Sequence, residues 1–273
     1  MREIERQTIL VTGATDGLGR ALAADLAGRG ATVLLHGRDD ERGRAALEEV
    51  QRTTGNDRLG WYRADLSSLD QVRELAAAVR RDHQELHCLV NNAGIGTRVP
   101  GGGVRQESAD GHELRFAVNY LAGYLLARLL QPLLVASAPS RIVNVSSLGQ
   151  APIDFDDVML ERDYSGVQAY CQSKLAQVMM TIDMDAELGG DGVTVESLHP
   201  ATYMPTKIVA SPVSSIAEGV EATARLVADP GLDGAGGRFF NGLNEARANE
   251  QAYDAGARRR LRELSDRLTG LAP

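Results

Sequence analysis

The chain has 273 residues, of which 43% are hydrophobic, and a formal net charge of −8 at pH 7. This excess of acidic side chains opposes binding to nucleic acid and to anionic membranes, so we expect neither as a partner. The two cysteines, Cys88 and Cys171, are too few for a disulfide framework and favour a reducing compartment, which predicts a cytoplasmic location. The first seven residues are largely polar and leave no room for a signal peptide.

Short runs of branched apolar residues alternate with longer helical patterns along the chain. This alternation predicts an α/β fold, with a Rossmann-type doubly wound parallel sheet that has helices on both faces. No linker-like stretch divides the chain, so we expect a single domain over residues 1–273, with a dinucleotide-binding part over about 1–150 and a catalytic and substrate-loop part over about 140–273. The expected strands are Thr8–Val11, Thr32–His36, Leu59–Tyr62, Leu86–Val90, Arg141–Val145, Val193–Leu198 and Arg238–Phe240.

Two further stretches have plain structural explanations. Leu121–Ala136 is the most apolar stretch, but it contains Arg128, Gln131 and Pro132, which predicts a buried helix and not a membrane span. The basic cluster at 258–262 shares its stretch with leucines at helical spacing, so we expect a solvated helix face there.

A glycine-rich turn follows the first expected strand and precedes a helical pattern over 20–26. Glycine lets the backbone approach a pyrophosphate closely, and the start of a helix offers unpaired N–H groups to its negative charge. An ordinary tight connection between a strand and a helix is the alternative for such a turn taken alone. The G-x-x-x-G-x-G spacing, led by Thr12, resembles the cofactor signature of the classical short-chain dehydrogenase/reductase family. The resemblance implies that the cofactor contacts Gly13, Thr15, Asp16, Gly17, Leu18 and Gly19.

The residues after the second expected strand bear on the choice of cofactor. An acidic residue near Gly37 would bind the ribose hydroxyls and repel a phosphate, whereas Arg38 offers a positive charge to a 2′-phosphate. Asp39 and Asp40 oppose this charge, unless they cap the helix whose pattern begins near Glu41. On these electrostatic grounds we expect NADP(H) rather than NAD(H) as the cofactor.

Two motifs follow the third and fourth expected strands. Asp65 and Leu66 end the third, and in the resembled family an acidic residue here meets the adenine ring. The alternative for Asp65 is to cap a helix that starts near Ser67 or Ser68. The segment 91–94 is similar to the family's N-N-A-G motif, whose small residues and amides brace the central sheet beside the cofactor. The resemblance implies cofactor contacts from Asp65, Leu66, Asn92, Ala93 and Gly94.

Tyr170 and Lys174 carry the sharpest chemical signal. They are four residues apart in a helical stretch that runs to Glu187, so their side chains share a face of the helix. A free tyrosine hydroxyl titrates near pH ~10, and an ammonium beside it favours the phenolate and moves its pKa toward neutrality. Tyrosine and lysine also meet at this spacing by chance, so the pair needs support from the rest of the chain.

Support comes from two serines and an asparagine upstream. In the family the second serine after this strand hydrogen-bonds the substrate carbonyl, which makes Ser147 the expected donor and Ser146 the alternative. Asn119 matches the helix asparagine that in the family holds a water between the lysine and solvent; the alternative is an asparagine satisfied by neighbouring backbone. The expected catalytic residues are Asn119, Ser147, Tyr170 and Lys174, of which Tyr170 and Lys174 also contact the cofactor.

The segment after the sixth expected strand departs from the family's pattern. His199 precedes Pro200 at the strand end, and we expect a structural role for it despite its convenient pKa. Pro200 is followed by alanine where the family usually has glycine. The threonine that contacts the nicotinamide lies one place late, at Thr206, with Thr202 as the alternative, so cofactor contacts are expected from Pro200, Thr202 and Thr206. No histidine forms a spacing with Cys, Asp or Glu that predicts a metal site.

The resemblance implies hydride transfer between NADPH and a ketone or aldehyde that becomes an alcohol, or the reverse, with Tyr170 as the proton donor. The segment Ala169–Ala176 and the long gap after Ser147 resemble the retinol-dehydrogenase-like branch, which favours a bulky apolar substrate such as a retinoid, steroid or polyketide. One alternative is a non-catalytic NADP-binding regulatory protein. Another is an enzyme of the same fold acting on nucleotide sugars, whose relatives usually carry G-x-x-G-x-x-G.

The substrate pocket and the mode of assembly complete the expectations. We expect pocket walls from the loop-like segments 96–105, 150–168 and 201–215. Asp154, Asp156 and Asp157 either meet a hydroxylated or cationic substrate or form an exposed acidic loop. The family commonly pairs the helices that run here over about Gly111–Ala136 and Gln168–Leu188, which implies a homodimer or homotetramer.

Overall fold

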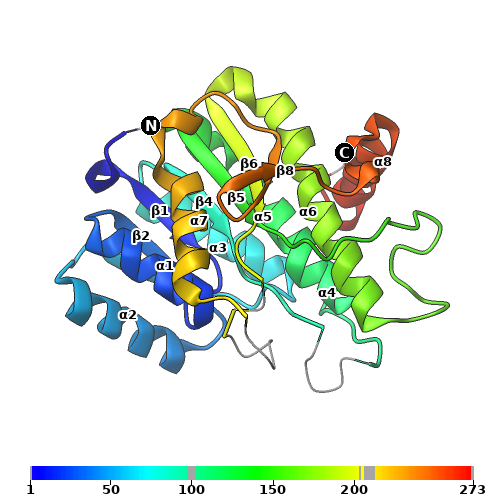
Figure 1. Cartoon of the computed structure of the whole chain (residues 1–273). Coiled ribbons are helices and arrows are strands. Elements are labelled where there is room, and N and C mark those ends of the chain that lie inside the picture. Colours follow the sequence, from blue (N-terminus) through cyan, green and yellow to red (C-terminus); the bar gives the residue numbers. More distant parts are fainter. Residues whose placement is uncertain (1, 98–102, 203, 206–212, 272–273) are drawn as a thin grey trace.

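A mostly parallel sheet runs through the part of the chain that the computed structural model describes, which is residues 2–97, 103–202, 204–205 and 213–271 (Figure 1). Its strands are β1 (Thr8–Val11), β2 (Thr32–Gly37), β3 (Leu59–Arg63), β4 (Cys88–Asn91), β5 (Ser140–Val145), β6 (Val193–His199), β7 (Arg238–Asn241) and β8 (Asn244–Ala246). Their order in the sheet is β3-β2-β1-β4-β5-β6-β7-β8, and only β7 and β8 pair antiparallel among these strands. The expected parallel sheet is therefore confirmed.

Helices cover both faces of this sheet. They are α1 (Gly17–Gly28), α2 (Asp40–Thr54), α3 (Leu69–Asp82), α4 (Leu114–Phe116), α5 (Ala122–Ala136), α6 (Gly166–Leu188), α7 (Ile216–Ala228) and α8 (Ala255–Leu268). Buried side chains of α1, α2 and α7 pack with Ile9 and Val11 on one face, whereas those of α3, α5 and α6 pack with Leu10 on the other. The alternation of neighbouring β1 residues between the two cores is what a doubly wound fold requires.

The burial of each strand explains whether the sequence predicted it. Every residue of β4, β5 and β6 is buried, in keeping with the apolar runs that predicted them. The short edge strand β8 was not predicted, because its three residues, Asn-Glu-Ala, form no apolar run. It pairs with β7 across a tight turn in which Gly242 has a φ of +58°.

Side-chain caps fix where three helices begin. α1 begins at Gly17, inside the glycine-rich turn and earlier than the helical pattern predicts, and Asp16 accepts a hydrogen bond from the Gly17 N–H. The N-cap of α3 is Ser68, so the alternative role of Asp65 as the cap is wrong. Asp39 caps α2 by accepting a hydrogen bond from the Arg42 N–H, as one of the two alternatives for this aspartate predicted.

α5 forms the centre of the helical layer on its side of the sheet. The helical segment Leu114–Ala136 is the one stretch of the described chain that is long and apolar enough to span a membrane by length and composition. In the fold, 61% of its most apolar window is buried inside the protein, and Leu125, Leu126 and Leu130 lie in the main core. The expected burial of Leu121–Ala136 is thus confirmed.

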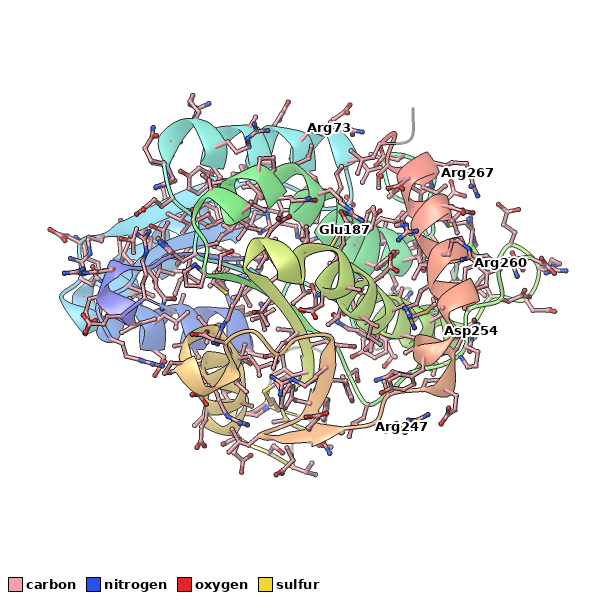
Figure 2. The ribbon with its side chains drawn as sticks, turned by 90° about the horizontal axis from the view of Figure 1, so that it is seen from above. Arg73, Glu187, Arg247, Asp254, Arg260 and Arg267 are labelled. Atoms are coloured by element: carbon pink, nitrogen blue, oxygen red, sulfur yellow. The ribbon has the colours of Figure 1, made fainter. Side chains whose placement is uncertain are left out.

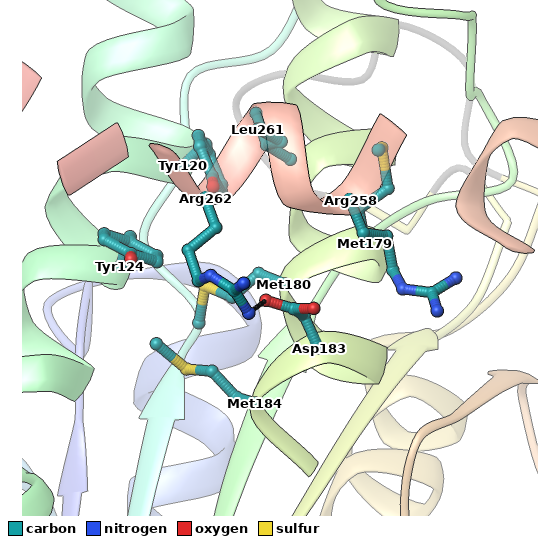
Figure 3. Close-up of a pocket in the computed structure, with 9 residues that line it drawn as sticks. All are labelled: Tyr120, Tyr124, Met179, Met180, Asp183, Met184, Arg258, Leu261 and Arg262. Carbon is teal, nitrogen blue, oxygen red and sulfur yellow. Dashed lines mark hydrogen bonds and ion pairs between the residues drawn. The ribbon is translucent and has the colours of Figure 1, made fainter. Parts of the chain in front are cut away.

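The C-terminal helix α8 lies against the junction of α5 and α6 (Figure 2). The Tyr120 hydroxyl hydrogen-bonds the Ser265 hydroxyl at 2.7 Å. Tyr124 donates to Asp266 at 2.6 Å. Figure 3 shows the inner side of this junction, where Arg262 forms an ion pair of 2.8 Å with Asp183 of α6.

The basic cluster on α8 is only partly the solvated face that we expected. Arg259 and Arg260 are exposed, and Arg260 lies over the ring of Phe155 with its guanidinium carbon 4.6 Å from the ring centre. Arg258 is half-buried and donates to the Ala252 carbonyl. The half-buried arginines of the cluster therefore hold α8 in place.

The position of α8 bears on the expected mode of assembly. Helices Gly111–Ala136 and Gln168–Leu188 were expected to pair between chains, but their junction carries α8 of the same chain. Two chains that paired through the part of this junction that α8 covers would have to displace it. The structure therefore argues against a homodimer or homotetramer formed in this way.

We expect light scattering to give a mass near 29.2 kDa, that of one chain, for the purified protein. Replacing Tyr124 by Phe and Arg262 by Ala together removes two tethers of α8, so this double variant is expected to gain mass with rising concentration. Arg259→Ala, which removes an exposed charge from the same helix, is the matched control. A wild-type mass of two or four chains would contradict the expectation.

Candidate active site

The glycine-rich turn packs directly against the end of β4. Thr12 accepts hydrogen bonds through its hydroxyl from the N–H groups of Asn92 and Ala93, at 2.9 and 3.1 Å. A Cβ at Gly13, where φ is +68°, would lie 2.9 Å from the Ala93 Cα, so the close approach requires glycine there. The amide of Asn92 donates to the Thr12 carbonyl, and that of Asn91 donates to Asn144. The bracing expected of the N-N-A-G segment is present.

One cavity of about 680 Å³ follows the carboxyl ends of the strands, a size typical of ligand sites. It joins the glycine-rich turn at the start of α1 to the middle of the molecule, where α6 lies. The predicted site residues that line it are Gly13, Thr15, Asp16, Gly17, Leu18, Gly19, Arg38, Asp65, Leu66, Asn92, Ala93, Gly94, Tyr170 and Lys174. The other predicted residues that the structure describes, Asn119, Ser147, Pro200 and Thr202, are not among the lining residues, and Thr206 lies outside the described residues.

The start of α1 gives one end of the cavity the character of an anion site. Gly17, Leu18 and Gly19 form the first turn of the helix and line the cavity, and the N-terminal N–H groups of a helix attract negative charge. Asp16 caps this helix, and Arg42 lies 3.2 Å from its carboxylate and offsets its charge.

His36 was missed as a site residue. Its Nδ1 accepts a hydrogen bond from the Gly13 N–H at 3.3 Å, and its Nε2 donates to the Ala64 carbonyl at 3.1 Å. Burial lowers the pKa of His36 to about 4, so the ring is neutral in the folded protein near pH 7. It thus holds the glycine-rich turn against the ends of β2 and β3. The sequence did contain a signal for this role, because His36 is a polar residue at the end of the apolar run Thr32–Gly37.

The two aspartates that follow Arg38 have structural partners. Asp39 caps α2, and Asp40 accepts a hydrogen bond from the Trp61 indole at 2.8 Å. Arg38 lines the cavity, whereas neither aspartate does. The adjacent carboxylates are therefore occupied elsewhere, and Arg38 presents the positive charge to the cavity.

Asp65 keeps its place in the cavity without capping a helix. Its carboxylate accepts hydrogen bonds from the N–H and the hydroxyl of Ser67, at 2.9 and 2.8 Å. These bonds fix the bend between β3 and α3 and leave Asp65, Leu66 and Ser67 along the cavity wall.

Tyr170 lines the end of the cavity formed by α6, and Ser147 lies beside Tyr170 without lining the cavity. The Ser147 hydroxyl hydrogen-bonds Tyr170 and accepts from the Gly149 N–H at 3.0 Å. Ser146 instead donates to the Lys174 carbonyl at 2.7 Å, which fastens β5 to α6. Of the two serines, Ser147 is therefore the one placed beside the tyrosine hydroxyl.

The pKa of Tyr170 differs from the sequence-based expectation. Burial raises it, while the hydrogen bond from Ser147 opposes part of that rise. The ammonium of Lys174 was expected to lower it, but Lys174 is not among the groups that shift Tyr170. Its Nζ lies 5.8 Å from the centre of the tyrosine ring and donates its hydrogen bonds elsewhere.

Lys174 is buried and holds two acceptors. Its Nζ donates to the Val145 carbonyl at 2.8 Å and to Oε1 of Gln177 at 3.0 Å. Burial without a carboxylate partner lowers its pKa to about 7. A Cβ at Gly94 would lie 3.6 Å from this Nζ and 3.3 Å from Oδ1 of Asn119, so the three residues meet at one point.

Asn119 lies in a π-helical turn, Ala117–Leu121, that joins α4 to α5. Its Oδ1 accepts from the Ile95 N–H at 2.6 Å, and its amide donates to the Ile95 carbonyl and to the Ser173 hydroxyl. The hydrogen-bonding groups of the Asn119 side chain are thus satisfied by the backbone of Ile95 and by Ser173 of α6. This agrees in part with the alternative role, an asparagine satisfied by neighbouring backbone. Asn119 fixes the cavity wall at Ile95 against the helix of Tyr170 and Lys174.

Two remaining groups of predicted residues have structural partners. His199 hydrogen-bonds the Thr202 hydroxyl at 3.0 Å, and burial together with the charge of Lys174 lowers its pKa. Its expected structural role agrees with this geometry. The acidic residues of the 154–157 loop form ion pairs, Asp157 and Asp154 with Arg162, and Asp156 with Arg260. The geometry therefore agrees with an exposed acidic loop, and not with aspartates that meet a hydroxylated or cationic substrate.

The pKa of His36 makes a test of its position possible. Between pH about 6.5 and 4 the unfolded chain binds a proton at this residue and the folded chain does not, so the stability contributed by neutral His36 is present above pH 6.5 and is lost as pH falls toward 4. His36→Asn keeps an acceptor for Gly13 without this titration. We expect urea unfolding to show a weaker pH slope for the variant, by on the order of 3 kcal/mol across the window. Equal slopes would place His36 outside the turn.

Known proteins are similar to this chain in sequence and in fold over nearly its whole length. A family model described as short chain dehydrogenase matches residues 7–215. Retinol dehydrogenase 13 of Mus musculus is 38% identical over 290 residues, which cover 98% of this chain and 85% of the relative. The structure of an uncharacterized protein from Mycobacterium paratuberculosis has a TM-score of 0.78 and 29% identity, covering 97% of this chain and 94% of that chain. A short chain dehydrogenase from Shigella flexneri, solved in complex with NADP, has a TM-score of 0.71 and 25% identity, over 88% of this chain and 98% of that chain.

Proposed function

Because this chain belongs to the short-chain dehydrogenase family, whose members are NAD(P)-dependent enzymes of alcohol and carbonyl groups, we propose that it is an NADPH-dependent oxidoreductase that reduces a ketone or aldehyde to an alcohol, or catalyses the reverse. One cavity carries this proposal, since it joins an anion site at the start of α1 to a buried tyrosine on α6. A dinucleotide needs the first of these features, and proton transfer to a reduced carbonyl needs the second.

Tyr170 is the proposed proton donor to the carbonyl oxygen. Burial raises its pKa, so the hydroxyl keeps its proton near neutral pH, which is the state that reduction requires. The Ser147 hydroxyl, beside it, donates to the same oxygen and stabilises the negative charge that develops there. When bound, NADPH supplies the hydride that the carbonyl carbon accepts. Lys174 binds the cofactor from α6, and Asn119 holds the cavity wall at Ile95 against the same helix.

The proposed preference for NADP over NAD rests on Arg38. This residue lines the cavity, and the carboxylates next to it are engaged by the Arg42 N–H and by Trp61. A 2′-phosphate at this end of the cavity would therefore meet a positive charge. The Shigella flexneri relative, which was solved with NADP, supports the same choice.

The proposed substrate is a bulky apolar carbonyl compound or alcohol. The wall of the cavity includes apolar side chains from three separate segments, Ile95, Leu114 with Val118, and Met204. The aspartates of the 154–157 loop are paired with arginines, which leaves no support for a cationic substrate there. The name of the relative, retinol dehydrogenase, adds support for an apolar substrate of this size.

Turnover tests the proposal directly. Loss of nicotinamide absorbance is followed with NADPH and a panel of apolar ketones and aldehydes, and Tyr170→Phe is expected to lower kcat by about 10² to 10⁴ because the proton donor is lost. NADPH binding should persist, as measured by quenching of Trp61, the single tryptophan, which packs against the cavity residue Gly37.

The control for Tyr170→Phe is Tyr253→Phe, which removes the same atom from a tyrosine that does not line the cavity. Undiminished turnover in Tyr170→Phe would remove the mechanism. NADPH binding by the wild type without turnover of any carbonyl would favour the regulatory alternative.

Cofactor preference gives a separate test. Arg38→Ala is expected to raise the Kd for NADPH by about 10- to 100-fold, because a hydrogen bond to a charged phosphate is lost. The Kd for NADH should stay nearly unchanged. Arg44→Ala removes an exposed arginine of α2 that does not line the cavity and serves as the control. An equal loss for both cofactors would show that Arg38 does not read the 2′-phosphate.

A further inference from the structure

We propose that Gln177 is a positioning residue for Lys174, whose ammonium it holds in place and whose charge it maintains. This inference deepens the proposed function, because Lys174 lines the cavity assigned there to NADPH. It rests on geometry inside α6 and on the polar groups that surround the lysine.

The two side chains form a buried pair on one face of α6. They are three residues apart, which makes them neighbours on a helix, and their relative exposures are 5% for Lys174 and 3% for Gln177. Oε1 of Gln177 accepts a hydrogen bond from Nζ at 3.0 Å. A glutamine oxygen is thus directed at a buried ammonium, where a carboxylate partner is the usual arrangement.

The number of N–H groups on the Lys174 ammonium explains how Gln177 orients it. A lysine ammonium has three N–H groups, and two of them donate to the Val145 carbonyl and to Gln177. Val145 ends β5, and Gln177 lies one turn further along the lysine's own helix. Two fixed acceptors set the direction of the third N–H group, which is left to serve the cavity that Lys174 lines.

A chain of buried hydrogen bonds holds the backbone of α6 at Gln177. The backbone carbonyl of Gln177 accepts from the Thr181 hydroxyl at 2.8 Å, and that hydroxyl accepts from the Asn144 amide at 2.9 Å. Asn144 precedes Val145 in β5 and in turn accepts from the Asn91 amide of β4. These bonds tie the backbone of α6 at Gln177 to β5, the strand that ends at Val145, the other acceptor of Lys174.

The groups around Lys174 leave Gln177 as the side chain that stabilises its charge. On its own helix it faces the ring of Tyr170, and from β6 it faces His199, whose pKa its charge lowers. No carboxylate in the described part of the chain forms an ion pair with it at 4.0 Å or less. Burial brings the pKa of Lys174 to about 7, so small changes in its acceptors alter its charge near neutral pH.

Two replacements of similar size should shift this titration in opposite directions. Gln177→Leu removes an acceptor of the charged form, so the Lys174 pKa is expected to fall by about one unit or more. Gln177→Glu places a negative charge at the same point, so the pKa is expected to rise by at least as much. A change that only loosened packing would not produce shifts of opposite sign.

The titration can be observed without substrate. The chain contains two lysines, Lys174 and Lys207, so labelling lysine with carbon-13 at Cε gives two signals, and Lys207→Arg assigns them. The Lys174 signal is followed from pH 5 to 11 in wild type and in both Gln177 variants. Gln172→Leu, which alters another buried glutamine of α6 that bonds to the Val158 carbonyl, is the control and should leave the midpoint unchanged.

Opposite shifts in the two variants would support the positioning role. Midpoints equal to that of wild type, or shifted in one direction in both variants, would overturn it. In an active enzyme the alkaline limb of kcat/KM for NADPH should move with the same midpoints, because kcat/KM reports the free enzyme. If no carbonyl is turned over, the proposed function fails, yet the lysine titration still decides the role of Gln177.

Discussion

The close contact between the glycine-rich turn after β1 and the end of β4 is the constraint on which the rest of the site depends. Asn92 donates hydrogen bonds to the hydroxyl and to the carbonyl of Thr12 across it, and Gly13 has no room for a side chain against Ala93. His36 closes the turn from the other side. With the turn fixed between β2 and β4, α1 has to begin at the cavity wall, which is where its N-terminal N–H groups have a use.

A second constraint places the chemical groups of α6. Asn91 and Asn144 are direct partners in the register of β4 and β5, and their amides continue the hydrogen-bond chain to Thr181. Buried amides are costly unless they are paired, so a shift of α6 along the sheet would lose these bonds. The network therefore fixes the height of Tyr170 and Lys174 relative to the ends of the strands.

The positions of the site residues could be predicted because parallel strands bring their carboxyl ends to one edge of the sheet, so Arg38, Asp65 and Asn92 line one cavity. Their interactions could not be predicted in the same way. Spacing on a helix predicted an ammonium that lowers the pKa of Tyr170, whereas burial raises it and Lys174 donates to other acceptors. Likewise α8 has an ordinary amphipathic pattern, and only the tertiary fold shows which helices it covers.

Burial acts on the two ionisable groups of the site in opposite directions, and this links its chemistry to its packing. It raises the pKa of Tyr170 and lowers that of Lys174, so in both cases it favours the neutral form. A neutral tyrosine is a suitable acid, but a neutral lysine is a poor partner for a cofactor. Burial removes the hydration of the Lys174 ammonium, so its hydrogen-bond acceptors have to stabilise the charge instead. These acceptors are a backbone carbonyl of β5 and a side-chain amide of α6. A buried ammonium depends on such fixed acceptors, because its side chain is largely removed from solvent.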